Sequence, residues 1–581
     1  MRVLLVHPED EPPQQIPCPH FDLIIDFARA PISTYEHWSL RFGCPTISFY
    51  DFAKEIEDLH LVKKLLEPGM RVMVDQSGID WWDVLSLAVL PDLQSMMLIP
   101  RLADYLSSDC ELFATRPFPL AKCLQHSLGV QLRVIGSRRT AVSRFLRHYS
   151  SALSNLNIAQ LYQVAQDKFD KRHNIRRHLA ARAPSSKKPV FLLPTAYINV
   201  SRMAVSIAEL LPDHSFLLVC ARKSSELKSL PANVRMVSLD AYFAALNKAE
   251  IYTLMGDWEI LEQRLISRSK IFENAKIAGI FKGIPSLIRW ALALRAAWIR
   301  VFQAEHVTAC LCADDNNPYS RIPLILANQR AIPTIALHHG ALDLCMAVKQ
   351  QCADYYLAKS AMERDYLLNQ CKIEQKTVIG PSAIIGSAPT KIANSESDQK
   401  CLVFFTEPYH VGSWRHDEVY RELLPHLLAL ASNYGLKLIF KLHPFESSKA
   451  HIRILRKFLP SEDVRRIGVI TGPPNSELWR NTRVAITVES TTALECTALG
   501  IPVFLCGWLR HHYGGYQGQY ARFGFGHILD SVEQLADIPQ LLRSQEKAAP
   551  VSHESSMTIN PQLLRELLTG RCAAREEAVG A

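Results

Sequence analysis

Short apolar runs alternate with amphipathic segments along most of the chain, and this alternation predicts strands separated by helices. In the first part of the chain, strands are expected near RVLLVH, FDLIID, PTISFY, RVMVD, ELFAT and VQLRVI, with helices in most of the gaps. Strands that are joined through helices pair in parallel. The pattern therefore predicts an α/β unit over residues 1–140.

The same alternation returns twice further along the chain. Strands of a second unit, over residues 187–390, are predicted at PVFLLPT, SFLLVCA, TACLCAD and PTIALHHG, with helices at AVSIAELL and YSRIPLILANQRA. Strands of a third unit, over residues 400–545, are predicted at CLVFFTE, LKLIFK, VAITV and VFLC. The predicted fold class is therefore α/β throughout.

Three segments lie outside these units. Residues 141–186 are helical in pattern and then strongly basic, which predicts a connector with a solvated face, although such a run could also meet acidic lipid. The polar stretch SAPTKIANSESDQK predicts a linker. Residues 546–581 are expected to form a C-terminal tail that ends in a frayed helix.

The segment IAGIFKGIPSLIRWALALRAAWIRVF predicts a long helix in which Lys and Arg are spaced among large apolar residues. Two interpretations stay open, namely packing against a sheet and lying along a bilayer surface. No stretch reaches the ~18 uninterrupted apolar residues that a spanning helix needs. Any membrane contact is therefore expected to be peripheral.

Composition narrows the class of protein. The 581 residues include 24 Gly, 33 Pro and 21% charged residues, which are ordinary values for globular proteins and exclude disordered and collagen-like chains. The net charge of +8 favours an anionic ligand only weakly. Nucleic-acid binding is disfavoured, because the basic residues cluster in the connector without an aromatic platform.

Cysteine spacing and the first residues indicate the compartment. The 14 cysteines follow no CxxC pattern, which favours a reducing environment. The opening MRVLLVHPEDEPP has no apolar signal region or cleavage site, so we expect no secretory signal. These features predict a cytoplasmic protein, at most peripheral to the inner membrane.

The run VAITVESTTALECTALGIPVFLCG predicts one strand, a loop, a helix and another strand. Ser490, Thr491 and Thr492 stand where the helix begins, at the carboxyl end of the preceding strand. Backbone N–H groups and the helix dipole at such a position suit a phosphate group. Alternatively, Thr492 and Glu495 form a capping box that only stabilises the helix. Glu495 could instead accept hydrogen bonds from ribose hydroxyls.

In LKLIFKLHPFES, an apolar strand ends at His443, and Pro444 follows. Proline favours extended geometry in the residue before it, which would hold His443 at the carboxyl end of its strand. Ligands of α/β sheets bind at that end, where a histidine can donate to a diphosphate oxygen. The alternative is a purely structural histidine.

In PTIALHHGALD, another strand ends at a pair of histidines. Gly340 would let the backbone approach a ligand, and His339 with Asp343 nearby is a candidate general base. Upstream, ADDNNPYSR places Asp314 and Asp315 at another strand end. Paired carboxylates can bind a metal ion, but the spacing favours a turn with a helix cap, so no metal site is expected.

Taken together, these motifs resemble the core of GT-B glycosyltransferases over about residues 187–545. The resemblance is to bacterial surface-polysaccharide enzymes: the Kdo transferases of capsule assembly, sialyl- and polysialyltransferases with HP and S-S/T motifs, and CDP-glycerol glycerophosphotransferases. His339-Gly340 is similar to a histidine-glycine motif, His443-Pro444 to the HP motif and Ser490-Thr491 to the S-S/T motif. The run ELWRNTRVAITVESTTALECTALGIPVF also resembles a signature of nonhydrolysing UDP-sugar epimerases.

This resemblance implies a GT-B-like pair of Rossmann-like domains, preceded here by an additional N-terminal α/β domain that would bind an acceptor or a partner. A nucleotide would bind between the pair, mostly to the C-terminal domain. The implied activity is inverting, metal-independent transfer of a sugar from a CMP-, CDP- or UDP-linked donor to a hydroxyl of a surface polysaccharide or lipid-linked glycan. The donor is a substrate, and no cofactor is implied.

In this interpretation His339 is the base, with Asp343 or Asp315 as fallback. His443 and Ser490 to Thr492 would stabilise the departing phosphate. The chain departs from the families in two respects, since it lacks the acidic D/E-D/E-G motif, and Gly-Ala-Leu follows His339 where Gly-Thr-Pro would be expected. Two alternatives stay open: an epimerase or hydrolase on the same fold, and a noncatalytic component of a capsule polysaccharide assembly complex in the cell envelope.

Overall fold

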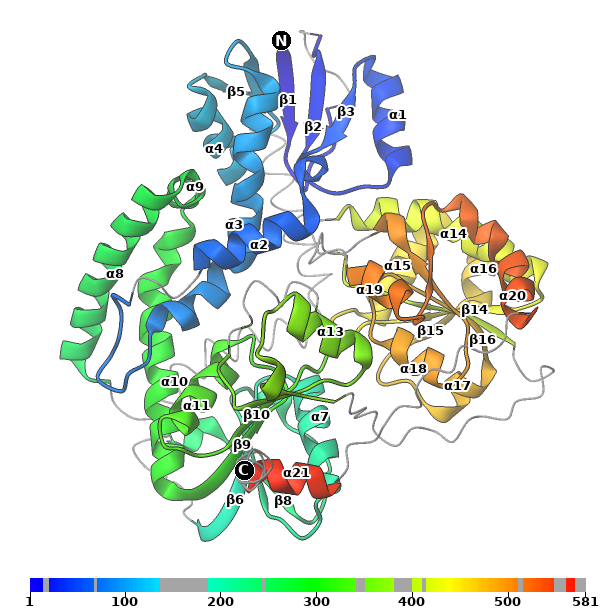
Figure 1. The fold of residues 1–581 in the computed structure, drawn as a ribbon. Helices are drawn as coiled ribbons and strands as arrows, with labels where there is room; N and C mark the ends of the chain where they lie inside the picture. The colour runs from blue at the N-terminus through cyan, green and yellow to red at the C-terminus, as the bar shows by residue number, and fades with distance from the viewer. Residues whose placement is uncertain are drawn as a thin grey trace. The chain divides into compact units, whose positions relative to one another are not determined.

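The chain forms two compact units in a computed structural model. The first holds residues 1–58, 94–161 and 388–553, and the second holds residues 59–93, 162–387 and 554–581. The structure describes residues 1–13, 20–66, 71–135, 186–242, 246–340, 342, 349, 351–380, 400–409, 414–509, 516–547 and 561–569. The predicted connector lies outside these residues, except for Ser186, where a strand starts. Nearly all of the predicted linker also lies outside them. Helices surround the sheets of each unit (Figure 1).

A five-stranded parallel sheet begins the first unit, with the strand order β3-β2-β1-β4-β5. Its strands are β1 (Arg2–Val6), β2 (Leu23–Asp26), β3 (Thr46–Ser48), β4 (Glu111–Ala114) and β5 (Leu132–Val134). The helices of this part of the chain are α1 (Ile32–Phe42), α2 (Glu55–Leu66), α3 (Trp81–Leu106) and α4 (Pro119–Leu128). Each strand matches a predicted apolar run, and only RVMVD has no strand.

The prediction of a strand at RVMVD is wrong because a loop forms around the carboxylate of Asp75. Val74 makes only an isolated antiparallel bridge with Asp80. Asp75 accepts hydrogen bonds from the backbone N–H of Ser77 at 2.8 Å and from the indole N–H of Trp81 at 2.9 Å. A carboxylate that bonds the turn following it bends the chain away from an extended strand.

A six-stranded parallel sheet completes the first unit, with the order β15-β14-β13-β16-β17-β18. Its strands are β13 (Cys401–Phe405), β14 (Lys437–Lys441), β15 (Gly468–Ile470), β16 (Thr482–Thr487), β17 (Val503–Cys506) and β18 (His527–Leu529). Its helices are α14 (His416–Asn433), α15 (Ser448–Phe458), α16 (Ser461–Arg466), α17 (Ser476–Asn481), α18 (Thr492–Ala498), α19 (Tyr516–Arg522) and α20 (Ile538–Lys547).

The second unit is built on a seven-stranded parallel sheet with the order β12-β11-β10-β9-β6-β7-β8. Its strands are β6 (Ser186–Thr195), β7 (Phe216–Cys220), β8 (Val234–Ser238), β9 (Glu305–Cys312), β10 (Thr334–Ala336), β11 (Tyr355–Leu357) and β12 (Val378–Ile379). Its helices are α7 (Ile198–Glu209), α8 (Lys248–Arg268), α9 (Lys270–Ala278), α10 (Ile284–Ala304), α11 (Pro318–Asn328), α13 (Ala361–Asn369) and α21 (Pro561–Leu568).

All three sheets of the described residues share one topology. When the strands of each sheet are numbered along the chain, every sheet contains the order 3-2-1-4-5, which is that of the Rossmann fold. The fold prediction, a pair of Rossmann-like domains preceded by another α/β domain, is therefore confirmed. The order reverses between the first and fourth strands, and ligands of such sheets bind outside the carboxyl ends at this reversal point. The three reversal points are β1/β4, β6/β9 and β13/β16.

The predicted long helix of the second unit is broken in two. Helix α9 ends at Gly279, whose φ of +80° favours glycine, and a short 3-10 helix (Ile280–Gly283) leads into α10. Ile288, Leu292 and Trp298 of α10 are buried in the protein, which supports the packing interpretation of this segment. No single described helix is long and apolar enough to span a membrane, whereas two bent helix pairs meet those criteria only when each pair is taken together.

Helix α21 follows the six-stranded sheet in the chain but belongs to the second unit. It buries Leu564, Leu567 and Leu568 in the core of the seven-stranded sheet. The C-terminal helix is thereby held by the core that β6 and β7 also form. The expected frayed end over residues 570–581 lies outside the described residues.

A buried ion pair joins the two sheets of the first unit. Asp26, the last residue of β2, accepts hydrogen bonds from Arg415 Nε at 2.6 Å and from a terminal guanidinium nitrogen at 2.7 Å. The guanidinium also lies 4.8 Å from the ring centroid of Trp38. The backbone continues the contact, since the N–H of Arg415 donates to the carbonyl of Arg29 at 2.7 Å. The N-terminal sheet is thus bonded directly to the segment that leads into α14.

Candidate functional site

The reversal point of the N-terminal sheet is occupied by contacts within the protein. The backbone N–H of His7, after β1, donates to the Thr115 hydroxyl, after β4, at 3.1 Å. Arg116 pairs with Glu9 at 2.7 Å and with Asp10 at 3.2 Å. These ion pairs bring opposite charges together at this point. The carboxyl edges of the other two sheets carry the histidines and hydroxyl groups singled out in the sequence.

In the six-stranded sheet, a bonded group of three residues lies at the carboxyl edge. Thr406 directly follows β13, and His443 follows β14. The N–H of His443 donates to Thr406 Oγ1 at 3.1 Å and to Glu446 Oε2 at 3.0 Å, and the Thr406 hydroxyl also bonds Glu446. This group fixes the backbone of the His-Pro turn beside the reversal point.

The orientation of the His443 ring determines which nitrogen carries its proton. Nδ1 accepts a hydrogen bond from the backbone N–H of Phe445 at 3.3 Å, and the Phe445 ring packs against the imidazole with centroids 5.0 Å apart. A neutral imidazole that accepts at Nδ1 carries its hydrogen on Nε2. His443 can therefore act as a hydrogen-bond donor through Nε2, the role predicted for it. Pro444 is exposed.

Two residues of this edge were missed by the sequence analysis. Burial raises the pKa of Glu446 to about 7, against the opposing effect of its hydrogen bonds to Thr406 and His443. Lys441, the last residue of β14, is buried, and its Nζ donates to the carbonyl of Leu442 at 2.9 Å. In the sequence, the position of Glu446 three residues after His443 could have indicated its role, because a side chain at that position can reach back to the turn.

We expect Glu446→Ala to weaken the turnover of the sugar donor that the sequence resemblance implies. Glu446→Gln should preserve most of this turnover. The alanine variant leaves the N–H of His443 and the Thr406 hydroxyl without their shared acceptor. Above the pKa of Glu446, where the carboxylate is ionised, losing such a bond costs about 1.5–3 kcal/mol. This corresponds to a loss of about 10- to 100-fold in kcat/KM. The amide of glutamine keeps an acceptor oxygen in place. Equal losses in both variants, measured by steady-state kinetics, would contradict the positioning role.

The hydroxyl cluster lies at the other side of the same reversal point. Helix α18 begins at Thr492, and its N-cap residue Thr491 makes no side-chain capping bond. Ser490 Oγ accepts hydrogen bonds from the Thr492 hydroxyl at 3.0 Å and from its N–H at 3.4 Å. The alternative that Thr492 and Glu495 form a capping box is wrong, because Thr492 is the first helical residue and not the cap.

The loop that carries Ser490 is supported by its neighbours. Thr487 at the end of β16 accepts a hydrogen bond from the N–H of Ser490 at 3.4 Å and donates to the carbonyl of Phe405 at 3.3 Å. Gln517 of α19 donates to the carbonyl of Val488 at 2.8 Å. His443 and Ser490 to Thr492 thus lie at the same edge of one sheet, with β13 between their strands. Glu495 lies in the first turn of α18, and its contact with ribose stays a prediction.

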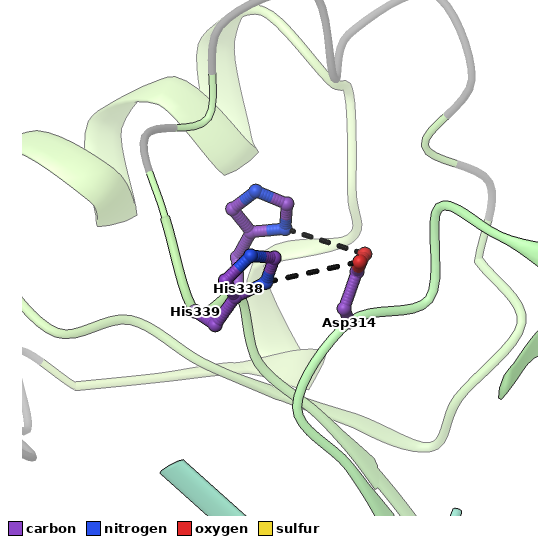
Figure 2. Close-up of side chains that lie close together, drawn as sticks. All are labelled: Asp314, His338 and His339. Atoms are coloured by element: carbon purple, nitrogen blue, oxygen red, sulfur yellow. Dashed lines mark ion pairs between the residues drawn. The ribbon is translucent and has the colours of Figure 1, made fainter. Parts of the chain in front are cut away.

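In the seven-stranded sheet, two histidines converge on one carboxylate at the carboxyl edge. Asp314 follows β9, and His338 and His339 follow the adjacent strand β10. Each histidine Nδ1 lies 3.7 Å from an oxygen of Asp314. Figure 2 shows both imidazole rings directed toward the Asp314 carboxylate. This cluster belongs to the second unit.

Backbone and amide groups hold the cluster in place. Asp314 accepts hydrogen bonds from the N–H of Asn316 at 3.0 Å and from the Asn317 amide at 3.1 Å. Lys359, after β11, donates to the carbonyls of His338 and Gly340. These bonds fix both the carboxylate and the histidine-glycine turn before any ligand arrives.

The surroundings of His339 favour its neutral form. Burial lowers the pKa of His339 below its ordinary value, although the Asp314 carboxylate opposes this effect. The side chain is 25% exposed, so a ligand can reach it. A neutral, accessible histidine beside a carboxylate can accept a proton near neutral pH, as a general base must.

Of the two fallback carboxylates of the sequence analysis, Asp315 does not join this cluster. Asp315 is fully buried, and its carboxylate bonds Lys349 and, at 3.3 Å, the Tyr356 hydroxyl. Asp343 lies outside the described residues. Asp314, which the sequence analysis placed at a strand end without a role, is the carboxylate that meets His339.

The same three side chains could also hold a divalent cation. Asp314, His338 and His339 offer ligand atoms that lie within 4.8 Å of one another. Imidazole nitrogens and a carboxylate oxygen are a common ligand set for zinc and related ions. The expected absence of a metal ion stays a prediction.

We expect Asp314→Asn to shift the pH profile of turnover to lower pH. Asp314 raises the pKa of His339, so loss of its charge should lower that pKa further. If His339 is the general base, the rate rises with pH as His339 loses its proton, so the acid limb of log kcat against pH should move to lower pH. The maximal rate should also fall, since the imidazolium loses its partner. If the acid limb of the Asp314→Asn variant stays in place, Asp314 does not influence the pKa that limits turnover.

Comparisons with known proteins find only distant structural likenesses. No protein-family model and no curated protein matches it. The UDP-GlcNAc 2-epimerase from Neisseria meningitidis, solved with UDP-GlcNAc, is 10% identical over 66% of this chain and 99% of its own, with a TM-score of 0.41. The glycosyltransferase SnogD from Streptomyces nogalater is 12% identical over 66% and 100%, with a TM-score of 0.38.

The wall teichoic acid polymerase TagF is another solved structure that this chain resembles. The two are 12% identical over 72% of this chain and 99% of that one, with a TM-score of 0.38. At such low TM-scores these likenesses transfer no residue role to this chain.

Proposed function

We propose that the chain is a glycosyltransferase that moves a sugar from a CMP-, CDP- or UDP-linked donor to a hydroxyl of a surface polysaccharide or lipid-linked glycan. The observation that carries this proposal is the set of hydrogen-bond donors at the β13/β16 reversal point. Thr406 and Ser490 follow the two strands that flank it, and His443 follows the next strand, β14. Rossmann-like sheets bind the phosphates of nucleotides at this position.

In the proposed reaction, this edge stabilises the departing nucleotide. The acceptor oxygen forms a bond to the anomeric carbon while the bond from that carbon to the donor phosphate breaks, and negative charge develops on the phosphate. His443 Nε2–H and the hydroxyl and N–H groups of Ser490 to Thr492 would donate to the phosphate oxygens. Fixed donors aimed at developing charge lower the barrier without the need for a metal ion.

The proton of the acceptor hydroxyl would pass to His339. The lowered pKa keeps this imidazole neutral near pH 7, and Asp314 would stabilise the imidazolium that forms. The preformed bonds of Asp314 to Asn316 and Asn317 hold that carboxylate in place during the transfer.

Nucleotide release with and without an acceptor tests the proposal. The full chain is incubated with labelled CMP-, CDP- and UDP-sugars, alone or with hydroxyl acceptors. A glycosyltransferase releases the nucleotide mainly when an acceptor is present, whereas turnover of the donor alone would favour an epimerase or hydrolase. A noncatalytic protein should show no rise in melting temperature with nucleotide, although bound ligand at 100 times its Kd adds about 2.7 kcal/mol of stability.

We expect His443→Gln to weaken both nucleotide affinity and turnover, each by about 10- to 100-fold, because a hydrogen bond to a charged phosphate is worth about 1.5–3 kcal/mol. Calorimetry and steady-state kinetics measure the two effects. His527→Gln is the matched control, since His527 is exposed on β18 of the same sheet, two strands beyond β16. Unchanged values of both quantities in His443→Gln would remove this residue from the site.

A further inference from the structure

A pocket of about 940 Å³ lies in the first unit, apart from the residues assigned above. It is lined by residues of α1 and of the segment around β3, and by Trp414, Gly507 and Trp508, the last two of which follow β17. Its volume is within the range of about 300–1,000 Å³ that is usual for small-molecule sites. Neither His443 nor Ser490 to Thr492 lines it.

Four aromatic side chains contribute to the lining, and each is only partly buried. They are Tyr35, Tyr50, Trp414 and Trp508. Tyrosine and tryptophan combine a flat apolar ring face, which carries partial negative charge, with a polar group at the edge. A sugar ring has the complementary character, because its C–H face is apolar and slightly positive while its rim carries hydroxyls. The aromatic lining thus suits a saccharide.

The charged groups of the lining argue against an anionic ligand. Glu36 and Asp51 supply two carboxylates, whereas Arg29 supplies one guanidinium, which lies 4.5 Å from the ring centroid of Tyr50. The two carboxylates would repel a phosphate or a uronic acid. They accept hydrogen bonds from hydroxyl groups, and the guanidinium donates them. The lining therefore favours a neutral, hydroxyl-rich ligand.

The aromatic walls are held rigidly. A Cβ atom on Gly507 would come within 2.7 Å of the Leu529 carbonyl oxygen and of Ile528 Cγ2, so only glycine fits where the Trp508 turn presses on β18. The backbone of Trp414 forms an isolated parallel β-bridge with that of Arg29. The next residue, Arg415, is the partner of the buried Asp26. A preformed pocket binds its ligand at a smaller cost in conformational entropy.

We propose that this pocket binds a short neutral oligosaccharide. Saccharide binding does not depend on the transfer reaction. The further step, that the pocket holds the glycan chain whose end accepts the new sugar, rests on the proposed function. The N-terminal α/β domain would then serve as an acceptor-binding domain whose site is completed by Trp414 and Trp508 of the C-terminal domain.

Saturation-transfer NMR on the full chain tests the proposal with maltotriose, cellotriose and chitotriose as neutral probes and trigalacturonate as the anionic probe. We expect at least one neutral trisaccharide to bind and trigalacturonate to bind more weakly. Trp508→Ala should weaken binding about tenfold, because it removes an aromatic face. Glu36→Ala, at an exposed position of α1, should weaken it about fivefold and keeps the test valid if the tryptophan variant fails to fold.

Tyr434→Ala is the control, since Tyr434 is an exposed aromatic residue of the same unit outside the pocket lining. The proposal is overturned if no neutral probe binds at about 10 mM, a concentration that would detect even weak saccharide affinity. It is also overturned if both pocket variants bind as tightly as Tyr434→Ala. If the chain binds a nucleotide but no saccharide, only the proposed saccharide pocket is contradicted. If it binds a saccharide but no nucleotide, only the proposed transfer reaction is contradicted.

Discussion

Replacement of His339 by alanine is expected to slow sugar transfer by about 10²–10⁴-fold, the usual contribution of a general base. His339 is neutral near pH 7 because burial lowers its pKa, and it lies 3.7 Å from the carboxylate that would stabilise its protonated form. Nucleotide affinity should be unchanged, since the proposed phosphate contacts come from His443 and Ser490 to Thr492 and not from His339. Steady-state kinetics and nucleotide calorimetry on the same protein preparation measure both quantities.

His338→Ala is the matched control for this prediction. Both histidines lie 3.7 Å from Asp314, but His338 is 11% exposed and His339 is 25% exposed. We expect the smaller loss for His338→Ala, because its ring is the less accessible to an acceptor. A wild-type rate in His339→Ala would disprove the base assignment. A larger loss in His338→Ala would transfer the role to that residue.

Replacement of Arg415 by methionine is expected to destabilise the first unit by about 3–5 kcal/mol, because it leaves the buried carboxylate of Asp26 without its partner. Asp26 is fully buried, and the bidentate pair is the main polar contact between the N-terminal sheet and the segment before α14. The loss of stability should lower the midpoint of urea unfolding. Tryptophan fluorescence can follow this unfolding, because Trp38 lies against the guanidinium of Arg415.

Two further variants separate the ion pair from a general effect of the substitution. Lys457→Met breaks the exposed pair of Lys457 with Asp417 and should cost no more than about 1 kcal/mol. Combining Asp26→Asn with Arg415→Met removes the orphaned charge and should restore part of the lost stability. A midpoint for Arg415→Met that equals that of Lys457→Met would show that the buried pair does not hold the N-terminal sheet.

Local sequence patterns predicted the strands on both sides of each reversal point and the positions of the histidines. They missed five strands that are only partly buried, namely β8, β11, β12, β15 and β18. Apolar runs bounded by polar loops mark parallel strands, and a residue placed just after such a run lies at the carboxyl edge. His339, His443 and Ser490 were placed in this way, and each follows its predicted strand in the structure. At RVMVD a strand was predicted and none forms, because the hydrogen bonds that Asp75 accepts from the following turn override the apolar pattern.

Contacts between distant parts of the chain were beyond such patterns. Asp26 and Arg415 are 389 residues apart, and neither stands in a motif. His339 meets Asp314 and not Asp315, although the two carboxylates are adjacent in the chain. Asp315 is fully buried against Lys349, whereas an oxygen of Asp314 lies 3.7 Å from His339 Nδ1. Likewise, α21 is an amphipathic helix whose choice of the seven-stranded sheet cannot be read from its own eight residues.

Calorimetric titration of the full chain with CMP, CDP, UDP and GDP tests the central claim, that a nucleotide binds at the edge formed by His443 and Ser490 to Thr492. We expect one of the pyrimidine nucleotides to bind, His443→Gln to weaken this binding by about 10- to 100-fold, and His339→Ala to leave it unchanged. Absence of binding by all four nucleotides, or equal affinity in the wild type and in His443→Gln, would show that this edge does not bind a nucleotide.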